Sequence, residues 1–101
     1  MMDFSDALRL IKQGKRVARE GWNGKGMWIY LVSGKAVPIE RWGVGRKYED
    51  KGSKYVTDDD KQNGYVTILP HIDMHTADGK RCIGWLASQT DLLADDWVVV
   101  E

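Results

Sequence analysis

Ten consecutive residues at positions 19–28, REGWNGKGMW, contain three glycines, two tryptophans and two cationic side chains. Glycines let a ligand approach backbone N–H groups, which suit phosphate oxygens, and a tryptophan offers a flat face for a base. Asn23 can donate and accept hydrogen bonds, while Arg19 and Lys25 supply positive charge. The alternative is a tight turn with two core tryptophans, which the residue types alone slightly favour.

A second polar cluster occupies residues 88–91, with the sequence SQTD. Ser88 stands three residues before Asp91, as in a capping box that opens a short helix, although aspartate replaces the usual glutamate. A helix start is also a natural anion site, and Asp91 could instead accept hydrogen bonds from ribose hydroxyls. The sequence leaves both roles of Asp91 open.

The sequence contains no recognisable arrangement of catalytic residues. His71, Asp73 and His75 alternate along a predicted strand and could bind a metal, but no fourth ligand is indicated and a polar strand face is favoured. No serine lies in a nucleophile elbow, no phosphate-binding loop is complete, and no spacing marks an acid–base pair of carboxylates. These residues give no indication of a catalyst or of a cofactor, whereas the two polar clusters could bind a ligand.

The length and charge of the chain limit its number of domains and its class of ligand. The 101 residues are enough for one domain, which we expect to span residues 1–101. Fifteen basic residues balance fifteen acidic ones, which argues against binding a nucleic-acid polymer or a membrane surface.

The chain starts without a signal-peptide pattern and has no apolar run of roughly 20 residues, so we expect it in the cytoplasm. The single cysteine, Cys82, is expected to be a small buried apolar residue.

Hydrophobic spacing predicts an α+β fold, with a mostly antiparallel sheet, an N-terminal amphipathic helix and a short second helix near the C-terminus. The first helix is expected to be capped by Asp3 or Ser5 and to stop at Gly14. Strands are predicted over residues 15–19, 27–32, 65–69 (continuing towards 74), 81–86 and 98–100. Residues 33–35 are expected to turn the second strand into residues 36–39, which place Pro38 at an edge, and residues 77–80 to form an Asp-Gly hairpin turn. Residues 43–64 are expected to be a solvated loop, with a short strand at 55–57.

Three blocks occurring in order resemble one family. They are FSDALRLIKQGKRVAREGWNGKGMWIYLV, then GW at 84–85, then ASQTDLLADDW. Together they are similar to the small phage and prophage proteins of the Thoeris anti-defence protein two family. The likeness covers roughly residues 3–39 and 81–100, and residues 43–64 carry no matching motif.

The resemblance implies a binding protein that is not an enzyme. It would act as a sponge that sequesters a nucleotide second messenger in the cytoplasm of an infected bacterial host. The implied ligand is a cyclic ADP-ribose isomer, in a glycocyclic form, and some members also hold cyclic dinucleotides at separate sites. The family implies a homotetramer with pockets between subunits. The candidate ligand-binding residues come from the two polar clusters: Arg19, Trp22, Asn23, Gly24, Lys25, Ser88, Gln89, Thr90 and Asp91.

Two other functions stay open at this point. One is a hydrolase that degrades a cyclic nucleotide signal, and the other is a phage protein-interaction module anchored by the loop tryptophan.

Two of the other four tryptophans are assigned to the core from their positions in the sequence. Trp28 and Trp97 are expected in the core, whereas Trp42 and Trp85 are left unassigned.

Overall fold

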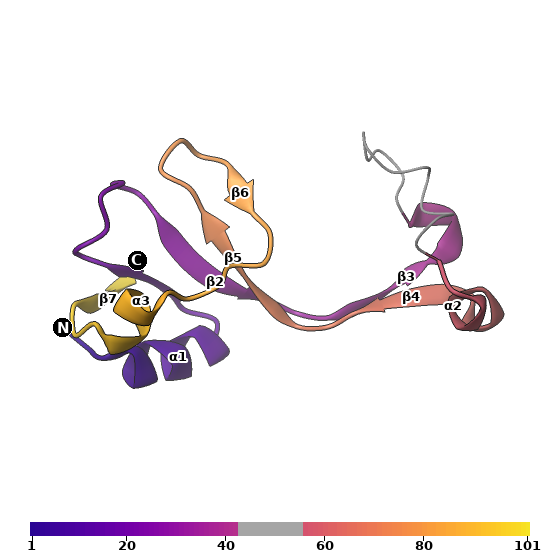
Figure 1. Cartoon of the computed structure of the whole chain (residues 1–101), viewed down its shortest axis with the longest axis horizontal. Coiled ribbons are helices and arrows are strands. Elements are labelled where there is room, and N and C mark those ends of the chain that lie inside the picture. Colours follow the sequence, from indigo (N-terminus) through magenta and orange to yellow (C-terminus); the bar gives the residue numbers. More distant parts are fainter. Residues whose placement is uncertain (43–55) are drawn as a thin grey trace. The chain divides into compact units, whose positions relative to one another are not determined.

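The computed structural model describes residues 1–42 and 56–101, which form an α+β fold with antiparallel sheets (Figure 1). The chain divides into two compact units. The first unit comprises Met1–Val32 and His71–Glu101, and the second comprises Ser33–Pro70. Each unit is described by itself below. In the described residues, no helix is long and apolar enough to cross a membrane.

The first unit begins with helix α1, Phe4–Lys12, as the sequence predicts. The Asp3 side chain caps it by accepting a hydrogen bond from the Asp6 backbone N–H at 2.9 Å. Ala7 and Ile11 face inward and are completely buried. Their spacing of four residues puts both on one side of the helix, which therefore packs that side against the sheet.

The sheet of this unit has five antiparallel strands in the order β6-β5-β2-β1-β7. Their bounds are β1 Arg16–Arg19, β2 Trp28–Val32, β5 His71–His75, β6 Arg81–Cys82 and β7 Trp97–Val100. Helix α1 contacts β1, β2 and β7. Because side chains alternate along each strand, one face of the sheet meets α1 and the other face points away from it.

The core lies between α1 and that first face. Val17 and Ile29 stand directly opposite each other in β1 and β2, and neither is exposed to solvent. Trp97 is also fully buried, which confirms the structural role expected for it. The remaining buried members are Ala7, Ile11 and Met74.

The predicted hairpin joins β5 to β6, with Gly79 at φ 83° in its turn. Cys82 on β6 is exposed, so the expectation of a buried cysteine is wrong. Cys82 stands opposite Met74, on the core face, but it belongs to a two-residue edge strand. Residues 83–86 do not continue the predicted strand.

Helix α3, Gln89–Leu93, precedes β7 and starts with the predicted capping box. The Ser88 hydroxyl accepts a hydrogen bond from the Asp91 N–H at 3.1 Å, and the Ser88 N–H donates to Asp91 Oδ2 at 3.2 Å. The aspartate therefore performs the role that glutamate usually has in this motif. Trp97 Nε1 donates to the carbonyl of Asp91 at 3.0 Å, which attaches α3 to the core.

The second unit differs from the prediction in its pairing. Strand β3, Lys35–Pro38, pairs with β4, Tyr65–Ile68, in a two-stranded antiparallel sheet. The predicted reversal at residues 33–35 is wrong, because β3 does not pair with β2. Pro38 does lie on an edge, since both strands of a two-stranded sheet are edges. The 3-10 helix η1, Ile39–Arg41, follows β3.

Part of the predicted polar loop is a helix. Helix α2, Asp58–Asn63, begins with a complete capping box in which Thr57 and Asp60 exchange hydrogen bonds. The sequence prediction missed this helix because no apolar periodicity marks it, and none of its residues is buried. Residues 56 and 57 form no strand, and residues 43–55 lie outside the described residues.

Candidate ligand-binding site

The two polar clusters meet at the carboxylate of Asp91. Asp91 Oδ1 accepts hydrogen bonds from Arg19 Nη1 at 2.9 Å and from Trp22 Nε1 at 3.1 Å, while Oδ2 accepts from the Ser88 N–H. The side chains of Arg19 and Asp91 are only 14% and 13% exposed. Residues separated by about 70 positions are thus held together by one shielded, charge-assisted contact. We call Arg19, Trp22, Asp91 and Asp96 the Asp91 network.

Asp96 completes this network from the chain segment before β7. Arg19 Nε donates to Asp96 Oδ1 at 2.9 Å, and the Gly21 N–H donates to Asp96 Oδ2 at 2.7 Å. A Cβ atom added at Gly21 would lie 2.6 Å from that same oxygen. The first glycine of the loop is therefore required by a contact within the chain. Asp96 was not among the predicted site residues, although it belongs to the third family block, ASQTDLLADDW.

Hydrogen bonding sets the ionisation of both carboxyl groups. Burial raises the pKa of Asp91, but donors from Trp22, Arg19 and Ser88 outweigh burial and hold that pKa below its ordinary value. The Arg19 guanidinium lowers the pKa of Asp96 in the same way, and both carboxylates raise the pKa of Arg19. All three groups are therefore charged at neutral pH.

The ring of Trp22 is partly exposed and packs by its edges. Its centroid lies 5.4 Å from that of Trp97 at an interplanar angle of 79°, and 6.4 Å from that of Trp85 at 64°. Trp85 and Trp22 both pack against the buried cluster without being fully covered. Trp22 thus borders the core, with its N–H tied to Asp91. The structure reconciles the two sequence interpretations in part, since a half-buried ring retains surface for a ligand.

The tip of the loop presents polar groups. Asn23 and Lys25 are exposed, whereas Gly24 is packed closely against its own chain. A Cβ atom at Gly24 would lie 2.6 Å from Met27 Sδ and 2.9 Å from Ala77 Cβ. The space that a side chain would need at Gly24 is therefore filled by Met27 and by Ala77 of the β5–β6 turn. On the other cluster, Gln89 and Thr90 are exposed in the first turn of α3.

The alternating polar residues of β5 contact other groups of the chain. Asp73 is buried, accepts a hydrogen bond from the Gly84 N–H at 2.8 Å and lies 3.3 Å from His71 Nε2. His75 Nδ1 lies 3.0 Å from the carbonyl oxygen of Gly26. Across residues 1–42 and 56–101, no three His, Cys, Asp or Glu side chains are grouped so that they could hold a metal ion.

Trp28 is not in the core, so that expectation is wrong. It neighbours Ile29 on β2, and alternation places its ring on the face of the sheet that points away from α1. There it is half-buried and stacks on His75, with ring centroids 4.6 Å apart and planes 2° from parallel. Sequence reasoning also missed the neighbouring Arg16, Tyr30 and Arg81, although the alternation in residues 27–32 was a usable signal.

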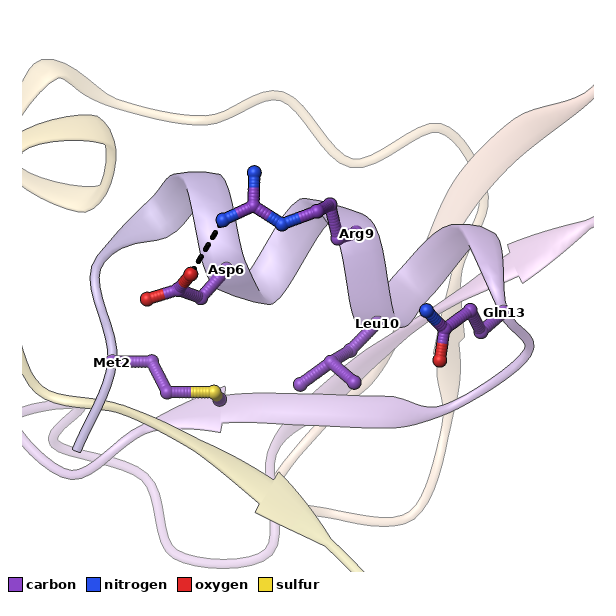
Figure 2. Close-up of a pocket in the computed structure, with 5 residues that line it drawn as sticks. All are labelled: Met2, Asp6, Arg9, Leu10 and Gln13. Carbon is purple, nitrogen blue, oxygen red and sulfur yellow. Dashed lines mark hydrogen bonds and ion pairs between the residues drawn. The ribbon is translucent and has the colours of Figure 1, made fainter.

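An open groove of about 260 Å³ runs along α1 (Figure 2). Figure 2 shows Arg9 and Asp6 at its edge, joined by an ion pair of 2.6 Å. None of the candidate ligand-binding residues lines this groove, whose walls are Met2, Asp6, Arg9, Leu10 and Gln13.

Comparison with known proteins connects this arrangement to one group. A family model described as the Thoeris anti-defense 2-like domain matches residues 2–100. A relative from Bacillus phage SP01, named Thoeris anti-defense 2, is 37% identical over 99 residues. The aligned part covers 98% of this chain and 94% of the relative.

Proposed function

From the premise that this chain belongs to the Thoeris anti-defense 2-like family, we propose that it binds and sequesters a cyclic ADP-ribose-type immune messenger without cleaving it. The family and the phage relative support a role against the Thoeris defence. The finer proposal concerns the ligand, which we take to be a cyclic ADP-ribose isomer in its glycocyclic form. Cyclic dinucleotides are a second ligand class to be tested.

One observation carries this proposal. The Asp91 network fixes the loop of residues 21–26 beside the start of α3, because Trp22 of the loop donates to Asp91 of the helix. The residue after Trp22 is the exposed Asn23, and the residue before Asp91 is the exposed Thr90. Polar groups able to read a base or ribose therefore extend from two segments that a shielded contact holds in place.

The chemistry of the candidate residues suits the parts of such a ligand. The partly exposed ring of Trp22 offers a surface for a base, and Lys25 carries a charge opposite to that of phosphate. Arg19 and Asp91 have a different task, since each is already engaged by the other. We assign them to positioning Trp22, and we assign ligand contact to Trp22, Asn23, Lys25, Gln89 and Thr90.

Sequestration without cleavage is supported by the state of the carboxylates at this site. A general acid must be protonated at the working pH, and a general base is most effective with a pKa near that pH. The pKa values of Asp91 and Asp96 are instead lowered, by donors that occupy their oxygens. Neither carboxylate is suited to transfer protons at neutral pH.

We further propose that the chain acts as a homotetramer in the host cytoplasm, with subunits completing the pocket. Several large apolar side chains in the first unit support a subunit contact: Ile83, Leu86 and Leu93 are 70%, 90% and 80% exposed. Sedimentation equilibrium at micromolar concentration tests this directly, and a monomer would contradict it.

Titration calorimetry tests the binding proposal with a panel of cyclic ADP-ribose isomers and cyclic dinucleotides. We expect saturable binding of at least one glycocyclic isomer, weakened by Asn23→Ala and unchanged by Lys15→Ala, which alters an exposed cation outside both clusters. A protein-interaction module would bind no member of the panel.

A further inference from the structure

The face of the five-stranded sheet that points away from α1 carries an aromatic and cationic cluster, formed by Arg16, Trp28, Tyr30, His75 and Arg81. We call this the outer-face cluster. Its members occupy neighbouring positions across four strands, since Trp28 stands opposite His75 and His75 stands opposite Arg81. Arg16 comes from β1, beside Val17, whose own side chain points to the core. Arg81 is exposed and the other four side chains are half-buried.

The aromatic members form a fixed floor. Trp28 stacks on His75 and lies 5.2 Å from the ring of Tyr30 between centroids. His75 is anchored through its contact with the Gly26 carbonyl. Three rings that restrain one another lose little further freedom when a ligand binds above them.

Two guanidinium groups lie over this floor. Arg16 Cζ is 4.9 Å from the centre of the Trp28 ring, and Arg81 Cζ is 5.4 Å from the same centre and 5.9 Å from that of Tyr30. These distances are within the range of cation–π contacts. One tryptophan therefore brings together two arginines from β1 and β6, strands that are not adjacent in the sheet.

Within the described residues, neither arginine forms an ion pair with a carboxylate. The acidic residue of this face is Asp73, which stands opposite Tyr30. Its side chain is 4% exposed, and Oδ1 is engaged by the Gly84 N–H and His71. Asp73 is therefore occupied elsewhere. Arg81 Nη1 donates a long hydrogen bond of 3.5 Å to the Lys80 carbonyl, and within the described residues no carboxylate occupies the other donors of the two guanidinium groups.

Both guanidinium groups carry a positive charge near the same ring, and an anion that contacts both reduces their mutual repulsion. Guanidinium forks match the oxygens of phosphate, which carries more charge and more acceptor oxygens than a carboxylate. We propose that Arg16 and Arg81 form a binding site for the phosphate group of a small-molecule ligand on this face. The site is separate from the Asp91 network, and the inference does not depend on which messenger the chain sequesters.

Inorganic pyrophosphate is the probe that tests this site, titrated into the full chain by calorimetry. We expect saturable binding that weakens at least tenfold in both Arg16→Gln and Arg81→Gln. Arg9→Gln is the matched control, because it removes an arginine from α1 on the other side of the sheet, and it should change the affinity less than twofold. Arg81→Lys keeps the charge but loses the fork, so its affinity should fall between those of the wild type and Arg81→Gln.

Melting temperatures of the variants establish that they are folded, and Arg81→Gln is the safer variant because its side chain is exposed. Absence of saturable pyrophosphate binding, equal weakening by Arg9→Gln, or equally tight binding of succinate would overturn the proposal. The variants leave the Asp91 network intact. Messenger binding measured on them in parallel therefore separates failure of this site from failure of the proposed function.

Discussion

At the scale of single residues, Asp91 has the role of a positioning group. Its oxygens accept hydrogen bonds from Arg19, Trp22 and Ser88, and its backbone carbonyl accepts one from Trp97. The sequence suggested either a helix cap or a ligand contact for this carboxylate. The structure shows the cap, and it adds an ion pair with Arg19 that no spacing in the sequence could reveal.

Replacing the Asp91 carboxylate should therefore act primarily by lowering the stability of the fold. We expect Asp91→Asn to lower the free energy of unfolding by about 1–3 kcal/mol, because charge-assisted bonds weaken and a shielded arginine loses one of its two partners. Messenger affinity should fall as a consequence, as Trp22 loses its anchor. Denaturant unfolding and calorimetry measure the two effects. Asp95→Asn, on an exposed neighbouring aspartate, is the control, and normal stability of Asp91→Asn would contradict this role.

Two substitutions of Trp22 separate its ring from its N–H group. Trp22→Ala should weaken messenger binding by about 1–3 kcal/mol, the range for losing one base stack. It should also lower the melting temperature, since the ring packs on Trp97 and Trp85. Trp22→Phe retains an aromatic face but not the donor to Asp91. We expect it to recover part of the affinity, and full recovery of stability with no recovery of binding would argue against stacking.

At the scale of elements, prediction succeeded where local signals and burial agree. The first helix with Asp3 as one of two candidate caps, the Asp-Gly turn at 78–79 and the capping box of Ser88 with Asp91 were predicted from the sequence, because caps and turns depend on neighbouring residues. The pairing of the strands was harder to predict from the sequence. Nothing local indicates that β3 pairs with β4 and not with β2, since pairing depends on distant residues.

The candidate site was likewise only partly predictable. The polar clusters were identified, but their junction joins residues about 70 positions apart, so its geometry could not be derived from spacing. The outer-face cluster was missed for a related reason. Arg16, Trp28 and Arg81 come from three strands, and strand order is what places them together.

The core face of β2 should dominate the stability of the first unit. Ile29 is completely buried opposite Val17, so Ile29→Ala should lower the free energy of unfolding by about 2–5 kcal/mol. Leu31 lies two residues further along the same strand and is 36% exposed. Leu31→Ala should lower the free energy of unfolding by less than half as much, as measured by denaturant unfolding. Equal losses in the two variants would show that Ile29 is no more buried in the core than Leu31.

At the scale of the whole molecule, basic and acidic residues balance, and stability against acid depends on particular carboxylates. The pKa values of Asp91 and Asp96 are lowered in the folded chain, so both groups stabilise the fold above their unfolded pKa of about 3.9. This contribution disappears as pH falls through the folded values.

We therefore expect the contribution of this pair to the unfolding free energy to stay level from about pH 7 to 5 and to decline below about pH 4. The decline should be shallower in a double variant, Asp91→Asn with Asp96→Asn, because its amides do not titrate. Denaturant unfolding at a series of pH values measures both slopes. Identical slopes in the two proteins would show that other groups govern acid stability.

The proposed sequestration requires that the protein holds the messenger and does not consume it. The most direct measurement incubates the protein with the glycocyclic ADP-ribose isomer, removes free ligand, denatures the protein by heat and analyses the released material by chromatography and mass spectrometry. We expect recovery of the unchanged cyclic ligand, in proportion to the protein, after short and long incubation alike. Recovery of a linear or hydrolysed product that increases with incubation time would contradict it.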